Sequence, residues 1–291
     1  MSIYAIIFFM IDLHTHTTAS DGQYSPKSLI EKAKKSGLSL IAITDHNTTQ
    51  GFSEAEIVAK EEDITLVKGV ELNIEWATGE FHLLALGIKN VSPALKEICA
   101  HLEKSRIERN KIIVQKLNEN GVDISYEELV KSFPFSQIGR PHIASFLVEK
   151  KVVRTRQQAF QKYLGSGRPC FEKMTGANLD EAVQAIVDSN AAPVIAHPLS
   201  LYVSWGKMEE VLQNIFERGV AGLEAFHPGA RNGACNRLEK LARSIGFFIT
   251  AGSDFHGEKV RSDRKLGHTS GNKKIEDTFY TDELLPYLSS L

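Results

Sequence analysis

Short apolar runs alternate with amphipathic segments along most of this chain. Apolar runs of strand length span 3–11, 38–43, 64–70, 81–86, 193–196, 222–225 and 247–250. Between the first two runs, apolar residues recur at helical spacing from Pro26 to Gly37, a proline near the start and a glycine at the stop. Strands that alternate with helices imply βα units, so we expect an α/β fold with a largely parallel sheet.

The alternation of strand-length apolar runs with amphipathic segments stops between residues 92 and 172. Leu95 to Asn120 has helical periodicity and many charges, and further helical stretches follow at 126–132, 141–150 and 155–164. Two turns interrupt them, and each places an arginine directly before a proline, Arg140 in the first and Arg168 in the second. We therefore expect a helical insertion at 92–172 that separates two parts of one α/β fold, 1–91 and 173–291.

Side chains that can bind metal gather at the ends of the predicted strands. His14 and His16 follow the first strand at alternate positions, so both point the same way. The other candidates are Asp21, His46, Glu71, His82, His197, Asp254 and His256. In a βα fold the strands' C-terminal ends form the usual site, although His82 lies near the start of its strand. Imidazoles with carboxylates suit Zn, Mn, Fe or Co.

Composition narrows the classes of function. The 291 residues carry a formal net charge of only −2, which excludes the global basic field that holds long nucleic acid without regard to sequence. The number of cysteines is odd and they are widely spaced, at Cys99, Cys170 and Cys235. This argues against a disulfide framework and favours a reducing cytoplasm. The apolar run 3–11 is too short to span a bilayer. We expect a cytoplasmic protein with no membrane association and no obligate protein partner.

At this point the sequence resembles the polymerase and histidinol phosphatase (PHP) superfamily. Within it, the chain is similar to the branch of RNase AM and the 3′,5′-nucleoside bisphosphate phosphatases, over stretches 4–7, 12–22, 42–46, 69–71, 146–149, 162–164, 196–198 and 252–256. The resemblance implies a distorted (β/α)₇ barrel with a helical insertion. It also implies three divalent metal ions, for which Mn²⁺ is favoured and Fe²⁺, Zn²⁺ and Co²⁺ are alternatives.

The resemblance further implies how the ions are held. The first would be bound by His14, His16, Glu71 and Asp254, the second by Asp21, His46 and His256, and the third by His82 and His197, with Glu71 bridging the first and third. The implied reaction is phosphoester hydrolysis, in which a metal-activated hydroxide attacks phosphorus.

Four residues outside this set are further candidates. Asp45 could orient a ligand imidazole or a water, or could cap a helix. His227 ends a strand and could contact the substrate or the leaving group. Arg140, which the resemblance associates with phosphate binding, and Arg168 could hold a second phosphate of the substrate through bidentate contacts.

The favoured function is that of a phosphoesterase acting on 5′-phosphorylated nucleotide ends. The resemblance implies two activities, namely 3′-dephosphorylation of nucleoside 3′,5′-bisphosphates and 5′-to-3′ hydrolysis of short RNA, and the residues do not rank them. One alternative is a phosphatase for a small metabolite such as histidinol phosphate. Another is a metal-bound regulatory module without catalysis, and a more distant one is an amidohydrolase.

Overall fold

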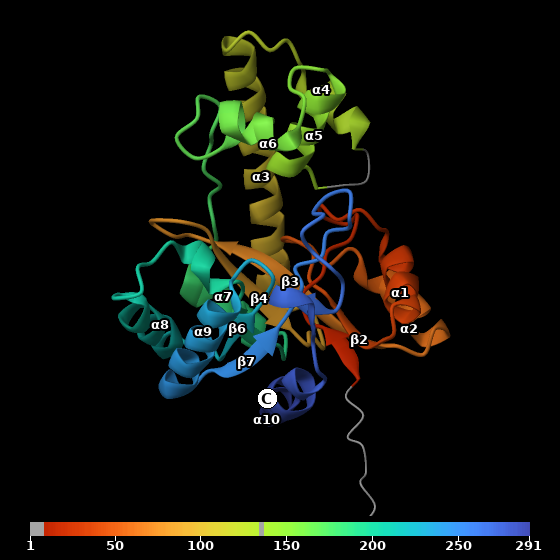
Figure 1. Cartoon of the computed structure of the whole chain (residues 1–291), viewed down its shortest axis with the longest axis vertical. Coiled ribbons are helices and arrows are strands. Elements are labelled where there is room, and N and C mark those ends of the chain that lie inside the picture. Colours follow the sequence, from red (N-terminus) through yellow and green to blue (C-terminus); the bar gives the residue numbers. More distant parts are fainter. Residues whose placement is uncertain (1–8, 134–136) are drawn as a thin grey trace, which may run out of the picture.

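The computed structural model describes residues 9–133 and 137–291, and its centre is a seven-stranded sheet (Figure 1). Along the sheet the strands follow their order in the sequence: β1 (Met10–Asp12), β2 (Leu38–Ile43), β3 (Thr65–Ile74), β4 (Phe81–Leu86), β5 (Ala192–Ile195), β6 (Gly222–Phe226) and β7 (Phe248–Ala251). The α/β prediction is confirmed. Of the predicted first strand, residues 3–8 lie outside the described residues.

Strand β4 runs against its neighbours. The pairings β1–β2, β2–β3, β5–β6 and β6–β7 are parallel, whereas β3–β4 and β4–β5 are antiparallel. The cause is the connection at 75–80, which is too short for the crossover that a parallel pair requires. The start of β4 therefore lies beside the end of β3, with His82 opposite Asn73. This reversal brings His82 to the edge where the parallel strands end.

The two edge strands approach each other beyond their C-terminal ends. There Thr15, after β1, forms a parallel bridge with Phe255, after β7, and the backbone N–H of His16 donates to Phe255 O at 2.9 Å. The sheet is thus a distorted barrel joined at its ligand-bearing end. Apolar side chains of its strands are fully buried in separate clusters, among them Ile41, Leu84 and Ile249.

Helices cover the outside of the sheet on both sides (Figure 1). They are α1 (Pro26–Lys35), α2 (Phe52–Glu61), α7 (Leu179–Val187), α8 (Met208–Glu217), α9 (Asn232–Ile245) and α10 (Leu285–Ser290), with short helices η2 (Pro198–Leu201), η3 (Ser270–Asn272) and η4 (Phe279–Leu284) and a small ribbon of β8 (His268–Thr269) and β9 (Lys273–Lys274). Helix α1 begins as predicted, because the Ser25 side chain accepts from Ser28 N and Pro26 opens the first turn. Among helices within residues 9–133 and 137–291, none is long and apolar enough to cross a bilayer.

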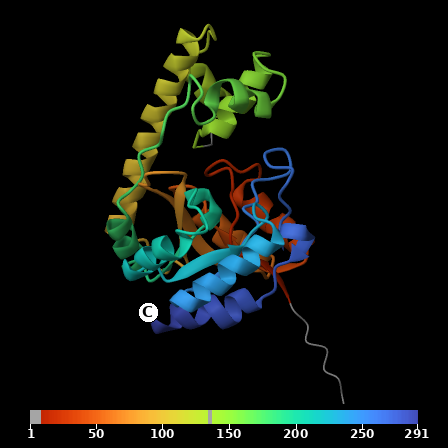
Figure 2. The ribbon, with the colours of Figure 1, turned by 60° about the vertical axis from the view of Figure 1, so that its left-hand side comes forward.

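A helical bundle stands over the barrel on the long helix α3 (Figure 2). It contains α3 (Pro93–Glu119), α4 (Tyr126–Ser132), α5 (Arg140–Glu149), α6 (Arg156–Ala159) and η1 (Phe160–Leu164). These helices share their own core, which includes Ile113, Leu117, Ile143 and Leu147. Arg140 opens α5 where the sequence predicted a turn, because a proline fits the first turn of a helix. We propose 92–172 as the bounds of this insertion between 1–91 and 173–291.

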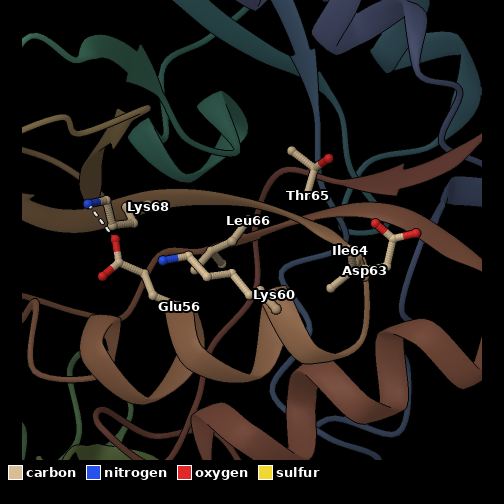
Figure 3. A pocket seen from close by; sticks show the side chains of 8 residues that line it. Glu56, Lys60, Asp63, Ile64, Thr65, Leu66 and Lys68 are labelled. Carbon is tan, nitrogen blue, oxygen red and sulfur yellow. Dashed lines mark ion pairs between the residues drawn. The ribbon is translucent and has the colours of Figure 1, made fainter.

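A surface hollow of about 490 Å³ lies between α2 and the beginning of β3 (Figure 3). Glu56 and Lys68 form an ion pair of 2.7 Å on its wall. From β3 its lining includes Thr65, Leu66 and Lys68, whereas the candidate ligand Glu71 lies further along the same strand. The hollow is therefore separate from the candidate metal centre.

Candidate metal centre

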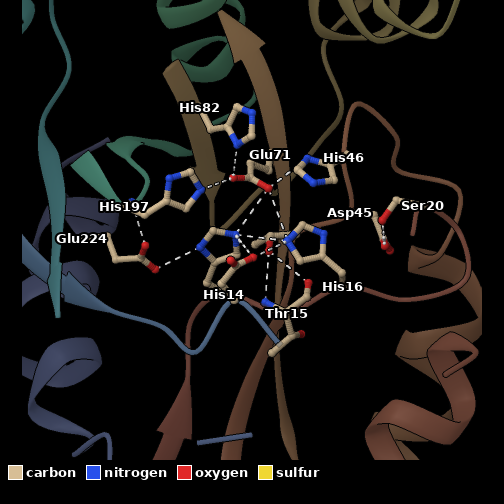
Figure 4. A network of polar contacts seen from close by, with 12 residues as sticks. His14, Thr15, His16, Ser20, Asp45, His46, Glu71, His82, His197 and Glu224 are labelled. Carbon is tan, nitrogen blue, oxygen red and sulfur yellow. Dashed lines mark hydrogen bonds and ion pairs between the residues drawn. The ribbon is translucent and has the colours of Figure 1, made fainter. Parts of the chain in front are cut away.

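The nine candidate ligands converge at one end of the barrel. Figure 4 labels His14, His16, His46, Glu71, His82 and His197 among them. Their ligand atoms form four overlapping sets, each with all atoms within 4.8 Å of one another: His16, Asp21, His46 and His256; His14, Glu71 and His197; His14, His16 and Asp254; and His46, Glu71 and His82. The first and third sets resemble two of the expected groups, and Glu71 is shared between the other two. The expected convergence, including that of His82, is what the structure shows.

Glu71 is the centre of this arrangement. Its carboxylate is fully buried, and its oxygens lie 2.8 Å from His82 Nδ1, 3.0 Å from His197 Nε2 and 2.9 Å from His46 Nδ1. Burial alone would raise its pKa, but the surrounding histidines, His46 and His82 foremost, hold the pKa of Glu71 well below its usual range. The carboxylate is therefore ionised and surrounded by imidazole nitrogens.

The donor set fits divalent metal ions. His16 Nδ1 and Asp21 Oδ1 are buried and have no hydrogen-bond partner among the described residues. In addition, His14 Nε2 and His16 Nε2 lie only 3.2 Å apart. Buried polar atoms are costly without a partner, and two imidazole nitrogens that converge in this way suit a shared cation. Nitrogen and carboxylate ligands together match first-row divalent ions.

Acceptors behind the ligand imidazoles fix their orientation. His14 Nδ1 lies 3.0 Å from Glu224 Oε1, His197 Nδ1 lies 3.0 Å from Ser200 Oγ, and His256 Nδ1 lies 2.9 Å from Asp254 O. An Nδ1–H that donates to such an acceptor leaves the Nε2 lone pair free for a metal. These three histidines are thus prepared as Nε2 ligands.

Glu224 contacts two of the candidate ligands, and it was not singled out in the sequence. It is 1% exposed in β6, and besides contacting His14 it accepts the backbone N–H of His197 at 2.8 Å. His197 has a left-handed backbone, φ 28°, which costs of order 1–3 kcal/mol and needs support from its surroundings. The available signal was a carboxylate inside an otherwise apolar strand, since buried carboxylates are rare unless paired.

Asp45 holds a loop. Its carboxylate accepts from Thr17 N at 2.7 Å and from Thr17 Oγ1 at 2.7 Å. It also accepts from Ser20 Oγ at 2.6 Å (Figure 4). The loop leads directly into Asp21. Helix α2 has Gly51 at its N-cap, so Asp45 does not cap it. The contacts of Asp45 position the ligand loop rather than a ligand imidazole.

The two arginines singled out in the sequence differ in position. Arg140 pairs with Glu80, and although burial acts in the opposite direction, Arg140 and then His82 lower the pKa of Glu80 to about 2. Arg140 therefore lies beside the ligand cluster. Arg168 is exposed in the turn that follows η1, where its backbone N–H donates to Gly165 O at 3.0 Å.

Two further arginines on α3 were not singled out in the sequence. Arg106 and Arg109 are 6% and 7% exposed, and the Nε atom of each has no hydrogen-bond partner within the described part of the chain. Arg106 donates to Asn73 Oδ1 at 3.3 Å, and Asn73 contacts His82 Nε2 at 2.8 Å. Burial, Arg106 and Arg140 lower the pKa of Arg109 to about 9. A group of buried guanidinium groups thus adjoins the ligand cluster.

His227 lies at the end of β6, beside the ligands. It is 4% exposed, and its ring centroid is 6.0 Å from that of His197. Burial lowers the pKa of His227 to about 4, so the imidazole is neutral at physiological pH. The sequence placed His227 correctly at a strand end of the site.

Comparison with characterised proteins supplies two relatives of nearly full length. A 5′-3′ exoribonuclease of Haemophilus influenzae is 31% identical over 245 residues, which cover 84% of this chain and 89% of the relative. A 3′,5′-nucleoside bisphosphate phosphatase of Chromobacterium violaceum is 30% identical over 260 residues, or 89% of this chain and 91% of the relative.

Solved structures agree with this relationship. An amidohydrolase from Chromobacterium violaceum, with bound sulfate and no metal, matches with a TM-score of 0.82 and 29% identity over 90% of this chain and 92% of its own. A candidate metal-dependent phosphoesterase from Bifidobacterium adolescentis matches with a TM-score of 0.83 and 28% identity, covering 95% and 96%. The model of the PHP domain matches residues 12–187, more than half of the sequence. The chain belongs to the PHP domain family.

Proposed function

We propose that this protein is a metal-dependent phosphoesterase that acts on 5′-phosphorylated nucleotide ends. Its substrates would be nucleoside 3′,5′-bisphosphates, dephosphorylated at the 3′ position, short 5′-phosphorylated RNA, hydrolysed from the 5′ end, or both. The observation that carries the proposal is the pairing of two neighbouring sites, a nine-ligand cluster and the buried arginines beside it.

The nine ligands would hold three divalent ions, with Mn²⁺ favoured. We assign His14, His16, Glu71 and Asp254 to the first, Asp21, His46 and His256 to the second, and His82 and His197 to the third. Ions bound there would supply a water nucleophile at neutral pH and neutralise charge on the phosphoryl group and the leaving oxygen. Asp45 would act by positioning the loop that carries Asp21, through its contacts with Thr17 and Ser20.

The arginines would hold the second phosphate of the substrate. Arg106 and Arg109 have buried N–H groups without partners among the described residues, and Arg140 adds a third guanidinium nearby. An anion supplies the charge and the acceptors that these groups lack, and planar guanidinium groups match phosphate geometry. Exposed Arg168 would be the weakest member of this anchor. A site built for two phosphates favours a bisphosphorylated end over a simple monoester.

The relatives support this proposal. One is a 5′-3′ exoribonuclease and the other a 3′,5′-nucleoside bisphosphate phosphatase. Hydrolysis of a phosphoester beside a further phosphate, which is the arrangement the two sites suit, would account for both activities. The formal net charge of −2 also favours short substrates over long nucleic acid.

The test is turnover of adenosine 3′,5′-bisphosphate and of a short 5′-phosphorylated RNA by Mn²⁺-loaded protein, each beside its 5′-hydroxyl counterpart. We expect strong dependence on the 5′-phosphate and loss of activity in Asp254→Asn, whereas Asp188→Asn, an exposed aspartate on the outer surface, serves as the matched control. Equal turnover of 5′-hydroxyl forms would favour a phosphatase for small metabolites, such as histidinol phosphate. No turnover with any metal would favour a regulatory module.

A further inference from the structure

His227 has the opposite hydrogen-bond arrangement to the ligand histidines beside it. The backbone N–H of Gly229 donates to His227 Nδ1 at 3.1 Å, so Nδ1 is an acceptor. In the neutral imidazole the proton then resides on Nε2. By contrast, His14 Nδ1 faces the acceptor Glu224 and leaves its Nε2 lone pair free. His227 Nε2 is therefore a donor and has no lone pair for a metal.

This N–H donor has no acceptor among the described residues. His227 Nε2 is buried and has no hydrogen-bond partner in residues 9–133 and 137–291. A buried N–H without an acceptor costs free energy, so an acceptor from outside the chain is the expected partner. Because the neighbouring groups are metal ligands, that acceptor would lie in the site itself.

Arg264 presents a second donor of the same kind. It is 7% exposed, and its Nε atom also lacks a hydrogen-bond partner among the residues that the structure describes. A Cβ atom added at Gly229 would lie 2.8 Å from His227 Cε1 and 3.1 Å from Arg264 Nη2, so both side chains pack against this glycine. Arg264 Nε is 3.8 Å from Asp254 Oδ2, beyond hydrogen-bond distance but beside the ligand cluster. A neutral donor and a cation thus adjoin one another at the edge of the metal centre.

We propose that His227 Nε2–H and Arg264 Nε–H together bind an oxygen of the phosphoryl group that is cleaved. This inference rests on the proposed function and adds two residues to it. The pair lies next to Asp254, after β7, whereas Arg106 approaches Asn73 from α3. The pair of His227 and Arg264 and the arginines beside α3 would therefore bind different phosphates. Donors already in place for an anionic oxygen stabilise it without rearrangement.

Kinetics of matched variants tests the pair. His227→Leu removes the donor, whereas His227→Gln retains an N–H near the position of Nε2. We expect His227→Leu and Arg264→Met each to lower kcat/KM by on the order of 100-fold and to weaken inhibition by orthophosphate about tenfold, with metal content unchanged. His227→Gln should keep most of the activity, and His101→Leu, an exposed histidine on α3, is the control. Unchanged orthophosphate inhibition in both variants, or a loss of metal that accounts for the defect, would overturn the inference.

A second measurement does not require turnover. In ¹⁵N-histidine spectra of the zinc-loaded protein, we expect His227 to carry its proton on Nε2 and its resonance to shift when orthophosphate is added. A proton on Nδ1, or no response to orthophosphate, would contradict the inference. If the wild type fails to hydrolyse a 3′,5′-bisphosphate while orthophosphate still shifts His227, the proposed substrate is wrong and the oxygen-binding pair stands.

Discussion

Replacement of Glu224 by glutamine would change one charge and one acceptor beneath the ligand cluster while keeping the side chain's shape. Glu224 accepts the N–H of His197 at 2.8 Å and faces His14 Nδ1 at 3.0 Å, so the carboxylate serves two donors. Glutamine has one acceptor oxygen and one NH₂ group. The glutamine NH₂ group would therefore face another N–H donor, that of His197 or that of His14 Nδ1. In the second case His14 could avoid the clash only by moving its proton from Nδ1 to Nε2.

Either result weakens the metal centre. If the amide oxygen stays with His14, the strained backbone of His197 loses its support, and a buried donor without an acceptor costs about 1–3 kcal/mol. If His14 changes tautomer, its Nε2 carries a proton and no longer offers a lone pair. Loss of such an outer contact typically lowers metal affinity by about 10–100-fold. That loss corresponds to about 1.4–2.7 kcal/mol, in agreement with the hydrogen-bond cost.

The assay is metal affinity, measured by competition with a chromophoric chelator for the wild type, Glu224→Gln and Glu239→Gln. Glu239 pairs with Arg243 on the exposed face of α9 and controls for loss of a carboxylate at the surface. We expect weaker binding in Glu224→Gln alone, together with a smaller increase in unfolding free energy when metal is added. Wild-type affinity in Glu224→Gln would refute the reasoning, because it would show that the orientation of His14 does not depend on this carboxylate.

Three further predictions follow from other contacts. Arg106→Met should lower kcat/KM for a 5′-phosphorylated substrate by about 10–100-fold without lowering unfolding stability, because this buried guanidinium has no carboxylate partner within the described residues and its Nε–H has no acceptor there. Arg168→Met should change kcat/KM far less, and equal losses in steady-state kinetics would contradict this ranking. Asp45→Asn changes the carboxylate that accepts three hydrogen bonds, so denaturant unfolding should show a free energy of unfolding lower by about 1–3 kcal/mol. Metal titration should show weaker binding at Asp21. Wild-type behaviour in both assays would argue against loop positioning by Asp45. In metal-free protein, burial opposes protonation of His14, but Glu224 and Glu71 prevail and raise its pKa. Protonated His14 therefore stabilises the fold fully below pH 6.5, and this stabilisation is lost as the pH rises through the raised pKa. Metal-loaded protein should instead gain stability over this range as the ligands deprotonate, and equal pH dependence of thermal unfolding in the two forms would contradict this prediction.

Much of the fold could be predicted because its signals are local. The strands 38–43 and 81–86 and the helix at 126–132 match the predicted ranges, since each is an apolar or periodic run bounded by polar residues. The antiparallel direction of β4 could also be predicted from the sequence, because the six residues between Ile74 and Phe81 are too few to form a crossover. That inference would have placed His82 at the site without reliance on the resemblance.

The remaining parts of the site depend on burial, which periodicity alone does not give. Arg106 and Arg109 are three residues apart in a long, charged helix, and in sequence they are indistinguishable from solvent-exposed charges. The fold of the insertion over the barrel buries them, and only then does it become informative that the Nε–H of each has no acceptor among the described residues. His227 follows the same principle, since a histidine at a strand end reads as another ligand until the N–H of Gly229 is seen to occupy its Nδ1. Candidate ligands can thus be predicted from residue type and position, whereas the groups proposed to recognise the substrate are identified from the structure, by the hydrogen-bonding atoms that have no partner among the described residues.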